Sequence, residues 1–461
     1  MARPRKRWKS QEESRRLGKW FTLLVGAMLV GSACSVAASP AASAGASAGA
    51  SAAASTGGGG ATTLTIAAVQ GVEDAGLKAL APMYKQAKGV TLNIVEAPYD
   101  NLYSKLVSTF QANDATYDLV MMDDPWMPKF GTDGSLTDLG SLGISRDADI
   151  ADVVWDVGTW PPPRGPVPPT EKSKPKQLLG VTIVGNVEMF MYRKDITSTA
   201  PASYDDVLTN AKAQKAAGLT GYIIRGKATN PVVADFLPIL WSQGGDVFDE
   251  NWNTVIDNDA SKAAINFLVN DLKATAQSDP GSTDAADRDK IMANGQGYQS
   301  SVWPGEINTA VLDPAVTKVK DKVAFIPIPK GKSGKGVGMM GNWMLGIPKA
   351  SKNQQAAADF IKWMLQADTQ KTYAQNNGIP SRTSVLTDAS LTAANPYFPV
   401  LAEALKSPPN WRPRTDQWNA VETILGTELN KALTGGQTGD QAATNAATQI
   451  RALMKSKGYT Q

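Results

Sequence analysis

The side chains best suited to chemistry or ligand contact in this sequence are aromatic rings and carboxylates in short loop motifs. Histidine is absent from all 461 residues. Its absence excludes Ser-His-Asp and Cys-His catalysis, the usual zinc sites and the commonest general base at neutral pH. The sequence also lacks a glycine-rich phosphate-binding loop that ends in Lys-Ser or Lys-Thr. We therefore predict no catalytic residue, no metal and no cofactor.

Carboxylates are the remaining candidates for catalysis. Asp123 and Asp124 end a predicted strand, and Glu188 and Glu306 lie in predicted strand or loop positions. Two carboxylates could serve as a glycosidase pair. Adjacent residues on a strand point to opposite faces, so Asp123 and Asp124 cannot easily act on one bond. We expect a protein that is not an enzyme, and an exported carbohydrate-active enzyme remains the alternative.

A tryptophan follows these carboxylates in the run Met121-Met122-Asp123-Asp124-Pro125-Trp126. A carboxylate can accept hydrogen bonds from hydroxyl groups, and an indole face can cover the C–H surface of a sugar ring. The pair therefore suits a polyhydroxylated ligand. Two alternatives stay open: Trp126 packs in the core, or the three side chains form a box for a cation such as a polyamine.

Similar pairings of tryptophan with polar or small residues recur in four later motifs. They are Trp241-Ser242-Gln243-Gly244-Gly245-Asp246, Trp303-Pro304-Gly305-Glu306, Gly341-Asn342-Trp343, and the run from Trp411 to Trp418 that includes Arg412 and Arg414. Small residues let a ligand approach the backbone. Any one motif is typical of a core or a surface, but together they predict a shared cleft lined by aromatic rings.

The elements that must position these motifs alternate between strand-like and helix-like segments. Apolar runs at 64–69, 90–96 and 117–123 have the length of strands. Between them, apolar residues recur at helical spacing, and Asp100 is placed to cap the second helix. This order predicts a parallel sheet whose carboxyl ends hold the ligand.

A second region of the same kind begins near Val181. Its predicted elements are a helix capped by Ser203 and Asp206, strands at 221–224 and 323–326, amphipathic helices around 265–272 and 360–365, an apolar run at 343–347 and helices after Gln417. The proline-rich stretch 161–176 predicts an extended surface loop.

The N-terminus has the three parts of a secretory signal. Residues 1–19 carry a charge of +6, so the rest of the chain carries −3, which gives no reason to expect nucleic acid. Residues 20–33 are uncharged and shorter than the roughly 20 residues of a membrane-spanning helix. The only cysteine, Cys34, follows Gly31-Ser32-Ala33, which resembles a bacterial lipobox, and residues 35–61 are almost entirely Ala, Ser and Gly. We predict lipidation at Cys34 and a flexible tether; an unmodified cysteine at an ordinary cleavage site is the alternative.

From about Leu64 onward, the chain resembles the extracellular solute-binding proteins of carbohydrate ABC importers, the family that includes maltose-binding protein. The resemblance rests on several blocks in the family's order: Tyr117-Asp118-Leu119-Val120 before Asp123, Gly185-Asn186 before Met191-Tyr192-Arg193-Lys194-Asp195, Pro201 to Asp206, Trp241 to Gly245, Gly346-Ile347-Pro348, and Gly378-Ile379-Pro380-Ser381-Arg382. The proline-rich loop departs from the family's pattern.

The resemblance implies an α/β fold of two lobes, each with a mostly parallel sheet flanked by helices, and a ligand cleft between the lobes. The segments it implies are a signal peptide (1–33), the anchor and tether (34–61), the first lobe (62–183 and 337–382) and the second lobe (184–336 and 383–461). It also implies a monomer on the outer face of the cell membrane that closes on a saccharide or polyol and delivers it to the permease subunits of an ABC importer. By motif position, the ligand contacts carried over are Gln70, Tyr99, Asp123, Asp124, Trp126, Asn186, Trp241, Gly244, Trp303, Gly305, Asn342, Trp343, Arg412 and Arg414.

Overall fold

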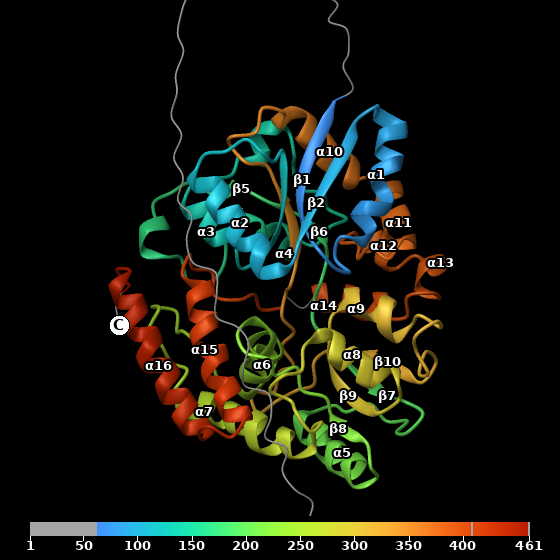
Figure 1. The fold of residues 1–461 in the computed structure, drawn as a ribbon, viewed down its shortest axis with the longest axis vertical. Helices are drawn as coiled ribbons and strands as arrows, with labels where there is room; N and C mark the ends of the chain where they lie inside the picture. Colours follow the sequence, from blue (N-terminus) through green and yellow to red (C-terminus); the bar gives the residue numbers. More distant parts are fainter. Residues whose placement is uncertain (1–61, 407–408, 460–461) are drawn as a thin grey trace, which may run out of the picture. The chain divides into compact units, whose positions relative to one another are not determined.

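A computed structural model describes residues 62–406 and 409–459, and two larger β-sheets organise this part of the chain (Figure 1). The predicted signal segment, Cys34 and the tether lie outside the described residues. Within those residues, no helix is both long enough and apolar enough to cross a membrane.

The first sheet has the strand order β2-β1-β3-β11-β6. β1 (Thr63–Val69) lies between β2 (Thr91–Ala97) and β3 (Leu119–Asp123) and runs parallel to both. Helices α1 (Ala75–Lys88) and α2 (Tyr99–Gln111) make the two crossovers, as the alternating pattern predicted. Every residue of β3 is buried, which explains why its sequence is almost continuously apolar.

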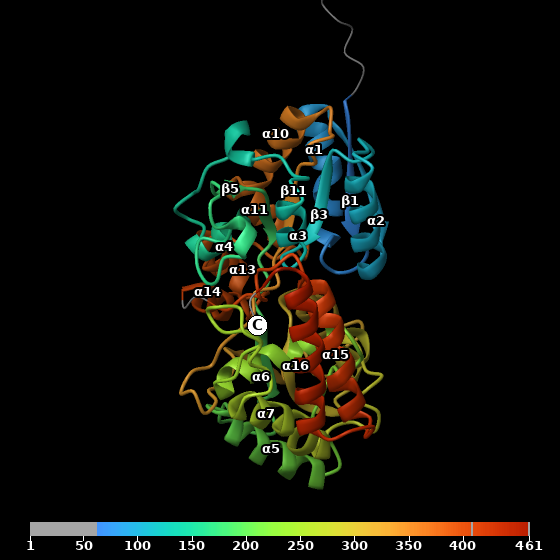
Figure 2. The same cartoon turned by 90° about the vertical axis from the view of Figure 1, so that its left-hand side faces the viewer.

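The second sheet has the strand order β10-β7-β9-β8. Its strands are β7 (Met189–Arg193), β8 (Thr220–Tyr222), β9 (Gly297–Val302) and β10 (Val323–Ile326). Helix α5 (Tyr204–Ala216) begins with the predicted capping box, in which Ser203 and Asp206 satisfy each other's backbone N–H groups. The other long helices on this side are α6 (Asn230–Gln243), α7 (Asp259–Asn266), α8 (Ala285–Ala293), α15 (Trp418–Leu433) and α16 (Gly439–Ser456). Figure 2 shows α15 and α16 running side by side.

Both sheets are mostly parallel, as predicted, but each contains one strand that runs opposite to the others and so makes the sheet mixed. In the first sheet, β11 (Trp343–Gly346) pairs antiparallel with both β3 and β6 (Val181–Val184). In the second, β7 pairs antiparallel with β9 and β10, and β8 pairs parallel with β9, so β7 alone runs opposite to the other three strands. The apolar periodicity of a segment identifies it as a strand but does not give the direction of its partner, so the sequence could not reveal which strands are antiparallel.

Shorter elements complete the described chain. They are α3 (Met127–Thr132), η1 (Leu139–Leu142), α4 (Asp152–Val157), β4 (Thr159–Trp160), η2 (Pro169–Glu171), β5 (Gln177–Leu178), η3 (Phe267–Leu272), η4 (Lys273–Thr275), α9 (Pro304–Glu306), η5 (Ile307–Val311), α10 (Gln354–Met364), α11 (Ala367–Gln375), α12 (Thr383–Leu386), α13 (Ala389–Thr392) and α14 (Phe398–Lys406). Asp100 does not cap α2, because the helix begins directly after Pro98 and Asp100 lies in its first turn.

The proline-rich loop is docked rather than free on the surface. The Trp252 indole donates to the Val167 carbonyl at 3.2 Å, and the Arg164 guanidinium lies 3.9 Å from the centre of the Trp411 ring and donates to the Pro409 carbonyl. Pro161 and Pro162 are buried. The loop therefore touches segments far away in the sequence.

Two chain segments that pass between the sheets lie next to each other. The Gly341 N–H donates to the Asn186 carbonyl at 3.0 Å, and the Glu188 N–H donates to the Met339 carbonyl at 2.8 Å. The Gly185 N–H donates to the Ile379 carbonyl at 3.0 Å, which ties in a third segment. Hydrogen bonds therefore join three chain segments where the chain passes between the two sheets.

Candidate ligand-binding cavity

A cavity of about 510 Å³ lies between the ends of the two sheets. From the first sheet it takes residues at the carboxyl ends of β1 and β3 and at the start of β11. From the other side it takes residues that follow β8 and β9, together with the first turns of α6 and α8. Its volume suits a small organic ligand.

Half of the predicted contact residues line this cavity. They are Gln70, Tyr99, Asp123, Asn186, Trp303, Trp343 and Arg412. They come from loops that are up to 342 positions apart in the sequence, and the rule that ligands bind at the carboxyl ends of strands places them together.

Two indoles, together with the phenol ring of Tyr99, form the aromatic part of the lining. Trp343 opens β11 and pairs in register with Asp123, the last residue of β3. Trp303 follows β9 and packs against Gly341, where a Cβ atom would lie 2.3 Å from the indole ring. Gly341 therefore has a steric reason to be glycine, since any side chain would displace Trp303.

Trp126 does not line the cavity. It is 2 % exposed and packs behind the lining, with its ring centre 4.8 Å from that of Tyr99 and 5.5 Å from that of Trp343. Trp126 therefore packs in the core, which is one of the alternatives that the sequence left open. It supports the two rings that face the cavity.

The carboxylate of Asp123 is fully hydrogen-bonded within the protein. Arg412 donates to both of its carboxylate oxygens, at 3.1 and 2.9 Å. The Tyr99 hydroxyl donates to one oxygen at 2.8 Å and the Asp124 N–H to the other at 2.9 Å. An ionised carboxylate accepts about four hydrogen bonds, so Asp123 orients Tyr99 and Arg412 rather than receiving solute hydroxyls.

Asp124 and Arg414 lie behind the same wall. Asp124 is fully buried and pairs with Arg412. Arg414 donates to the backbone carbonyls of Asp124 at 2.9 Å and Val157 at 2.7 Å. These contacts fasten the 410–414 segment to the first sheet and do not reach the cavity.

The other predicted residues outside the lining also have structural roles. Trp241, at the end of α6, donates to Asp246 at 3.2 Å, and Gly244 ends that helix in a left-handed conformation with φ 92°. Asn342 is buried and donates to the Thr182 hydroxyl at 3.2 Å. Gly305 lies beside Val72, whose Cγ2 would be 3.2 Å from a Cβ at that glycine.

Trp241 and Arg414 border a second, smaller hollow of about 240 Å³. It lies beneath the proline-rich loop, and Trp252 and Trp411 also line it. The sequence motifs predicted one shared cleft for their tryptophans, but the structure places Trp303 and Trp343 in the larger cavity, Trp241 and Trp411 in this hollow, and Trp126 and Trp418 in the core.

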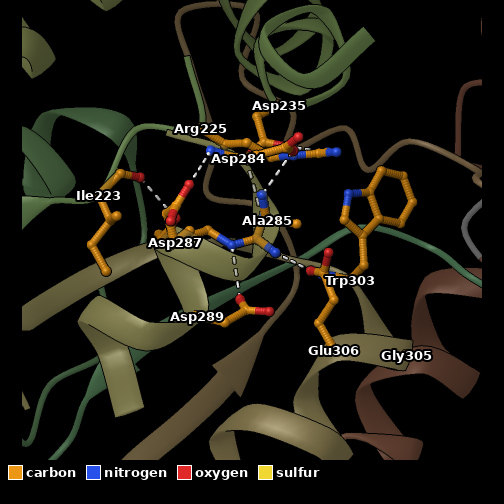
Figure 3. Close-up of polar contacts among 12 residues, drawn as sticks. Ile223, Arg225, Asp235, Asp284, Ala285, Asp287, Asp289, Trp303, Gly305 and Glu306 are labelled. Carbon is orange, nitrogen blue, oxygen red and sulfur yellow. Dashed lines mark hydrogen bonds and ion pairs between the residues drawn. The ribbon is translucent and has the colours of Figure 1, made fainter. Parts of the chain in front are cut away.

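The sequence did not reveal a network of charged residues that forms the opposite wall of the cavity (Figure 3). Arg225 pairs with Asp284 at 3.1 Å and with Asp235 at 3.5 Å. Arg288 is fully buried and pairs with Asp235 at 3.4 Å, with Asp289 at 3.1 Å and with Glu306. Asp284 also caps α8, and this capping box, Asp284 with Asp287, was the one signal in the sequence that could have located the wall.

Burial sets the protonation of two carboxyl groups in the lining. Burial, and after it the nearby carboxylates of Glu306 and Asp123, raise the pKa of Glu73 to about 7, while a backbone hydrogen bond and Arg225 oppose them. Burial and the Glu306 charge likewise raise the pKa of Asp289 to about 7, against the influence of Arg288. Both groups therefore titrate near neutral pH.

The glycosidase alternative has little support in this geometry. Glu188 is 1 % exposed, and neither of its carboxyl oxygens has a hydrogen-bond partner among the described residues. Burial, and after it the Asp235 charge, holds the pKa of Glu188 well above the usual range for glutamate. Within residues 62–406 and 409–459, no group of three or more Cys, Asp or Glu residues is arranged to hold a metal ion.

The comparison with solved structures identifies the fold. Maltose-bound MalE3 of T. maritima is 26% identical, with a TM-score of 0.74, and the match covers 85% of this chain and all of that one. A solute-binding protein of Agrobacterium vitis with bound D-mannitol is 25% identical, with a TM-score of 0.73, over 87% of this chain and all of that one. The fold is therefore the two-sheet α/β fold of periplasmic binding proteins.

The sequence comparison agrees. The mannitol-binding protein of Pseudomonas aeruginosa is 24% identical over 87% of this chain and 95% of its own length. A probable amino-acid ABC transporter periplasmic-binding protein of Sinorhizobium fredii is also 24% identical, over 82% and 85%. The family model for bacterial extracellular solute-binding proteins matches residues 67–371. The chain belongs to this family of binding proteins, which are not enzymes.

Proposed function

We propose that this chain is the solute receptor of an ABC importer and that its solute is a polyol or small saccharide. The observation that carries the proposal is the cavity between the sheets, where Trp303 and Trp343 offer apolar ring faces beside polar groups. Indole faces cover the C–H surface of a sugar, and Asn186, with a buried Oδ1 that has no hydrogen-bond partner among the described residues, can accept from a hydroxyl.

The ligands of similar proteins support this solute class. Of the structures compared above, one contains maltose and another contains D-mannitol, and one sequence relative is a mannitol-binding protein. Another relative is a probable periplasmic-binding protein of an amino-acid ABC transporter. An amino acid would need a cation for its carboxylate, but the three cations in the cavity lining, Arg225, Lys227 and Arg412, are already paired with carboxylates.

The cation box raised for a polyamine is not supported by this arrangement. Its carboxylates, Asp123 and Asp124, are both held by Arg412, and its aromatic ring, Trp126, lies behind the cavity wall. A polyamine would have to displace a buried guanidinium to reach them, which costs several kcal/mol.

The mechanism we propose is closure of two lobes on the solute without chemical change. For the lobes we propose the boundaries expected from the sequence, with residues 62–183 and 337–382 in the first lobe and 184–336 and 383–461 in the second. The solute touches one lobe first and gains contacts to the other only on closure, so it shifts the population toward the closed form. The permease subunits then recognise the closed form.

A ligand screen tests the proposed function. Thermal unfolding of residues 62–461 is followed with D-mannitol, D-glucitol, maltose, amino acids and spermidine, and affinities of hits are measured by calorimetry. We expect a higher melting temperature with at least one polyol or saccharide, because a ligand at 100 times its Kd adds about 2.7 kcal/mol of stability. A shift with amino acids or spermidine alone would overturn the proposal.

We also propose that the chain is exported and tethered to the outer face of the membrane through a lipid on Cys34. The support is the signal-like N-terminus, the lipobox-like motif and the Ala/Ser/Gly stretch at 35–61. In a bacterial host, we expect the full chain in the membrane fraction and Cys34→Ala outside it. Equal partition of both would contradict the lipid anchor.

A further inference from the structure

The cavity wall formed after β8 and β9 has more negative than positive charge. Arg225, Lys227 and Arg288 bring three cations to this wall, and four carboxylates share them: Asp235, Asp284, Asp289 and Glu306. Arg288 alone is shared by three of these carboxylates. The wall is therefore short of one positive charge.

The first sheet's side adds another carboxylate. Glu73 lines the cavity from the turn after β1, and the segment before it abuts the opposite wall, since Val72 lies against Gly305, the neighbour of Glu306. The charges that act on Glu73 most strongly are the carboxylates of Glu306 and Asp123. The cations nearest to these groups are already engaged: Arg412 with Asp123, and Arg288 with Glu306.

Two buried side-chain atoms of lining residues have no hydrogen-bond partner among the described residues: the Asn186 Oδ1 acceptor and the Arg412 Nε donor. Burial and neighbouring carboxylates raise the pKa values of Glu73 and Asp289 to about 7, and Asp289 shares Arg288 with Asp235 and Glu306. A ligand that brings several N–H donors and a positive charge would pair with the Asn186 Oδ1 atom and with these two carboxyl groups.

We propose that the solute carries an ammonium group on its polyhydroxylated skeleton, and that the facing carboxylates of Glu73, Asp289 and Glu306 hold this ammonium between the two sheets. The indoles of Trp303 and Trp343 then cover the skeleton and face the cation. This inference rests on the proposed function, because it refines the solute class of the same cavity. The solute is an aminated polyol or amino sugar.

Matched pairs of compounds test the inference. Calorimetry at pH 7.5 compares D-glucitol with D-glucamine, its 1-amino-1-deoxy analogue, and D-glucose with D-glucosamine. The members of each pair differ by one amine in place of one hydroxyl. We expect the amine of at least one pair to bind tenfold or more tightly than its neutral partner, and the preference to shrink when salt is raised from 50 to 500 mM.

Substitutions of the proposed carboxylates test whether they cause the preference for the amine. Glu73→Gln and Asp289→Asn should each reduce the preference for the amine by at least threefold, whereas Glu403→Gln, a matched change on the exposed face of α14, should leave it unchanged. Circular dichroism confirms that each variant is folded. If a variant does not fold, the comparison of each amine with its neutral partner in the unaltered protein still tests the inference.

The outcomes separate the inference from the function on which it rests. Binding of neutral compounds as tight as that of their amines, or a preference that both cavity variants keep, overturns the inference alone. If neither the four compounds nor any polyol or saccharide of the wider screen binds, the proposed function fails, and the inference fails with it.

Discussion

Arg412 holds Asp123 through two hydrogen bonds, from Nη1 to Oδ2 at 3.1 Å and from Nη2 to Oδ1 at 2.9 Å. Arg412 is 3 % exposed and Asp123 is 4 % exposed, and 289 positions of sequence separate them. The pair fastens the segment before α15 to the end of β3, and it leaves Tyr99 and the Trp343 indole as the aromatic contact surface on this side of the cavity.

We predict that Arg412→Ala lowers the free energy of unfolding by about 3–5 kcal/mol, because it leaves Asp123 and Asp124 buried without a counter-ion. Urea denaturation measures the change. Arg451→Ala is the control, since Arg451 pairs with Asp257 at a partly exposed site and should cost about 1 kcal/mol or less. Equal losses in the two variants would contradict a structural role for the Arg412 pair.

The two tryptophans at the end of the first sheet should behave differently. Trp343→Ala removes a ring that faces the cavity and should weaken solute binding by at least about 1 kcal/mol. Trp126→Ala empties a site behind the lining and should chiefly cost stability, about 3–5 kcal/mol. Calorimetry and urea denaturation of both variants separate the effects, and a larger loss of affinity in Trp126→Ala would show that the assignment is reversed.

Gly341→Ala should weaken binding through Trp303. The new methyl group would lie 2.3 Å from the indole, so the ring must move out of its place in the lining. We expect a fall in affinity of tenfold or more and a changed tryptophan emission spectrum. Gly436→Ala, where the nearest atom would be 3.3 Å away, serves as the control. Unchanged affinity in Gly341→Ala would mean that Trp303 does not contact the solute.

Stability should depend on pH through Glu73. Its pKa is raised from 4.5 to about 7 in the folded chain, chiefly by burial and then by Glu306 and Asp123, with Arg225 opposing. Between these pH values the unfolded chain loses the proton and the folded chain keeps it, so Glu73 lowers the free energy of unfolding as pH rises. Below pH 4.5 the effect vanishes, and above pH 7 it is constant.

The matching experiment compares Glu73→Gln with the unaltered protein. Compared with the unaltered protein, the variant should have a similar free energy of unfolding at pH 4.5. At pH 7.5 its free energy of unfolding should be higher by on the order of 3 kcal/mol, because one pKa unit corresponds to about 1.4 kcal/mol. Urea denaturation across this pH range measures the difference. A difference that does not change with pH would show that Glu73 titrates normally.

The sequence predicted the parallel half of the first sheet well, because β1 to β3 and their crossover helices have regular apolar spacing. It missed β11 as an antiparallel partner of β3, since that pairing joins residues more than 200 positions apart and no local pattern records it.

The binding cavity was predicted only in part for the same reason. Trp303, Trp343 and Tyr99 lie at strand ends, where a general rule places ligand contacts. Trp126 has the same local signature, but Tyr99 and Trp343 cover it in the folded chain. The carboxylates of Asp123 and Asp124 resembled ligand contacts until the structure showed Arg412 bound to them.

The most direct test of the account is a crystal structure of residues 62–461 with the tightest-binding solute of the screen. We predict electron density for an intact polyol or saccharide in the cavity between the two sheets, within van der Waals contact of the Trp303 and Trp343 rings. Density for the solute in the hollow beside Trp241 and Trp411, with this cavity empty, would contradict the account.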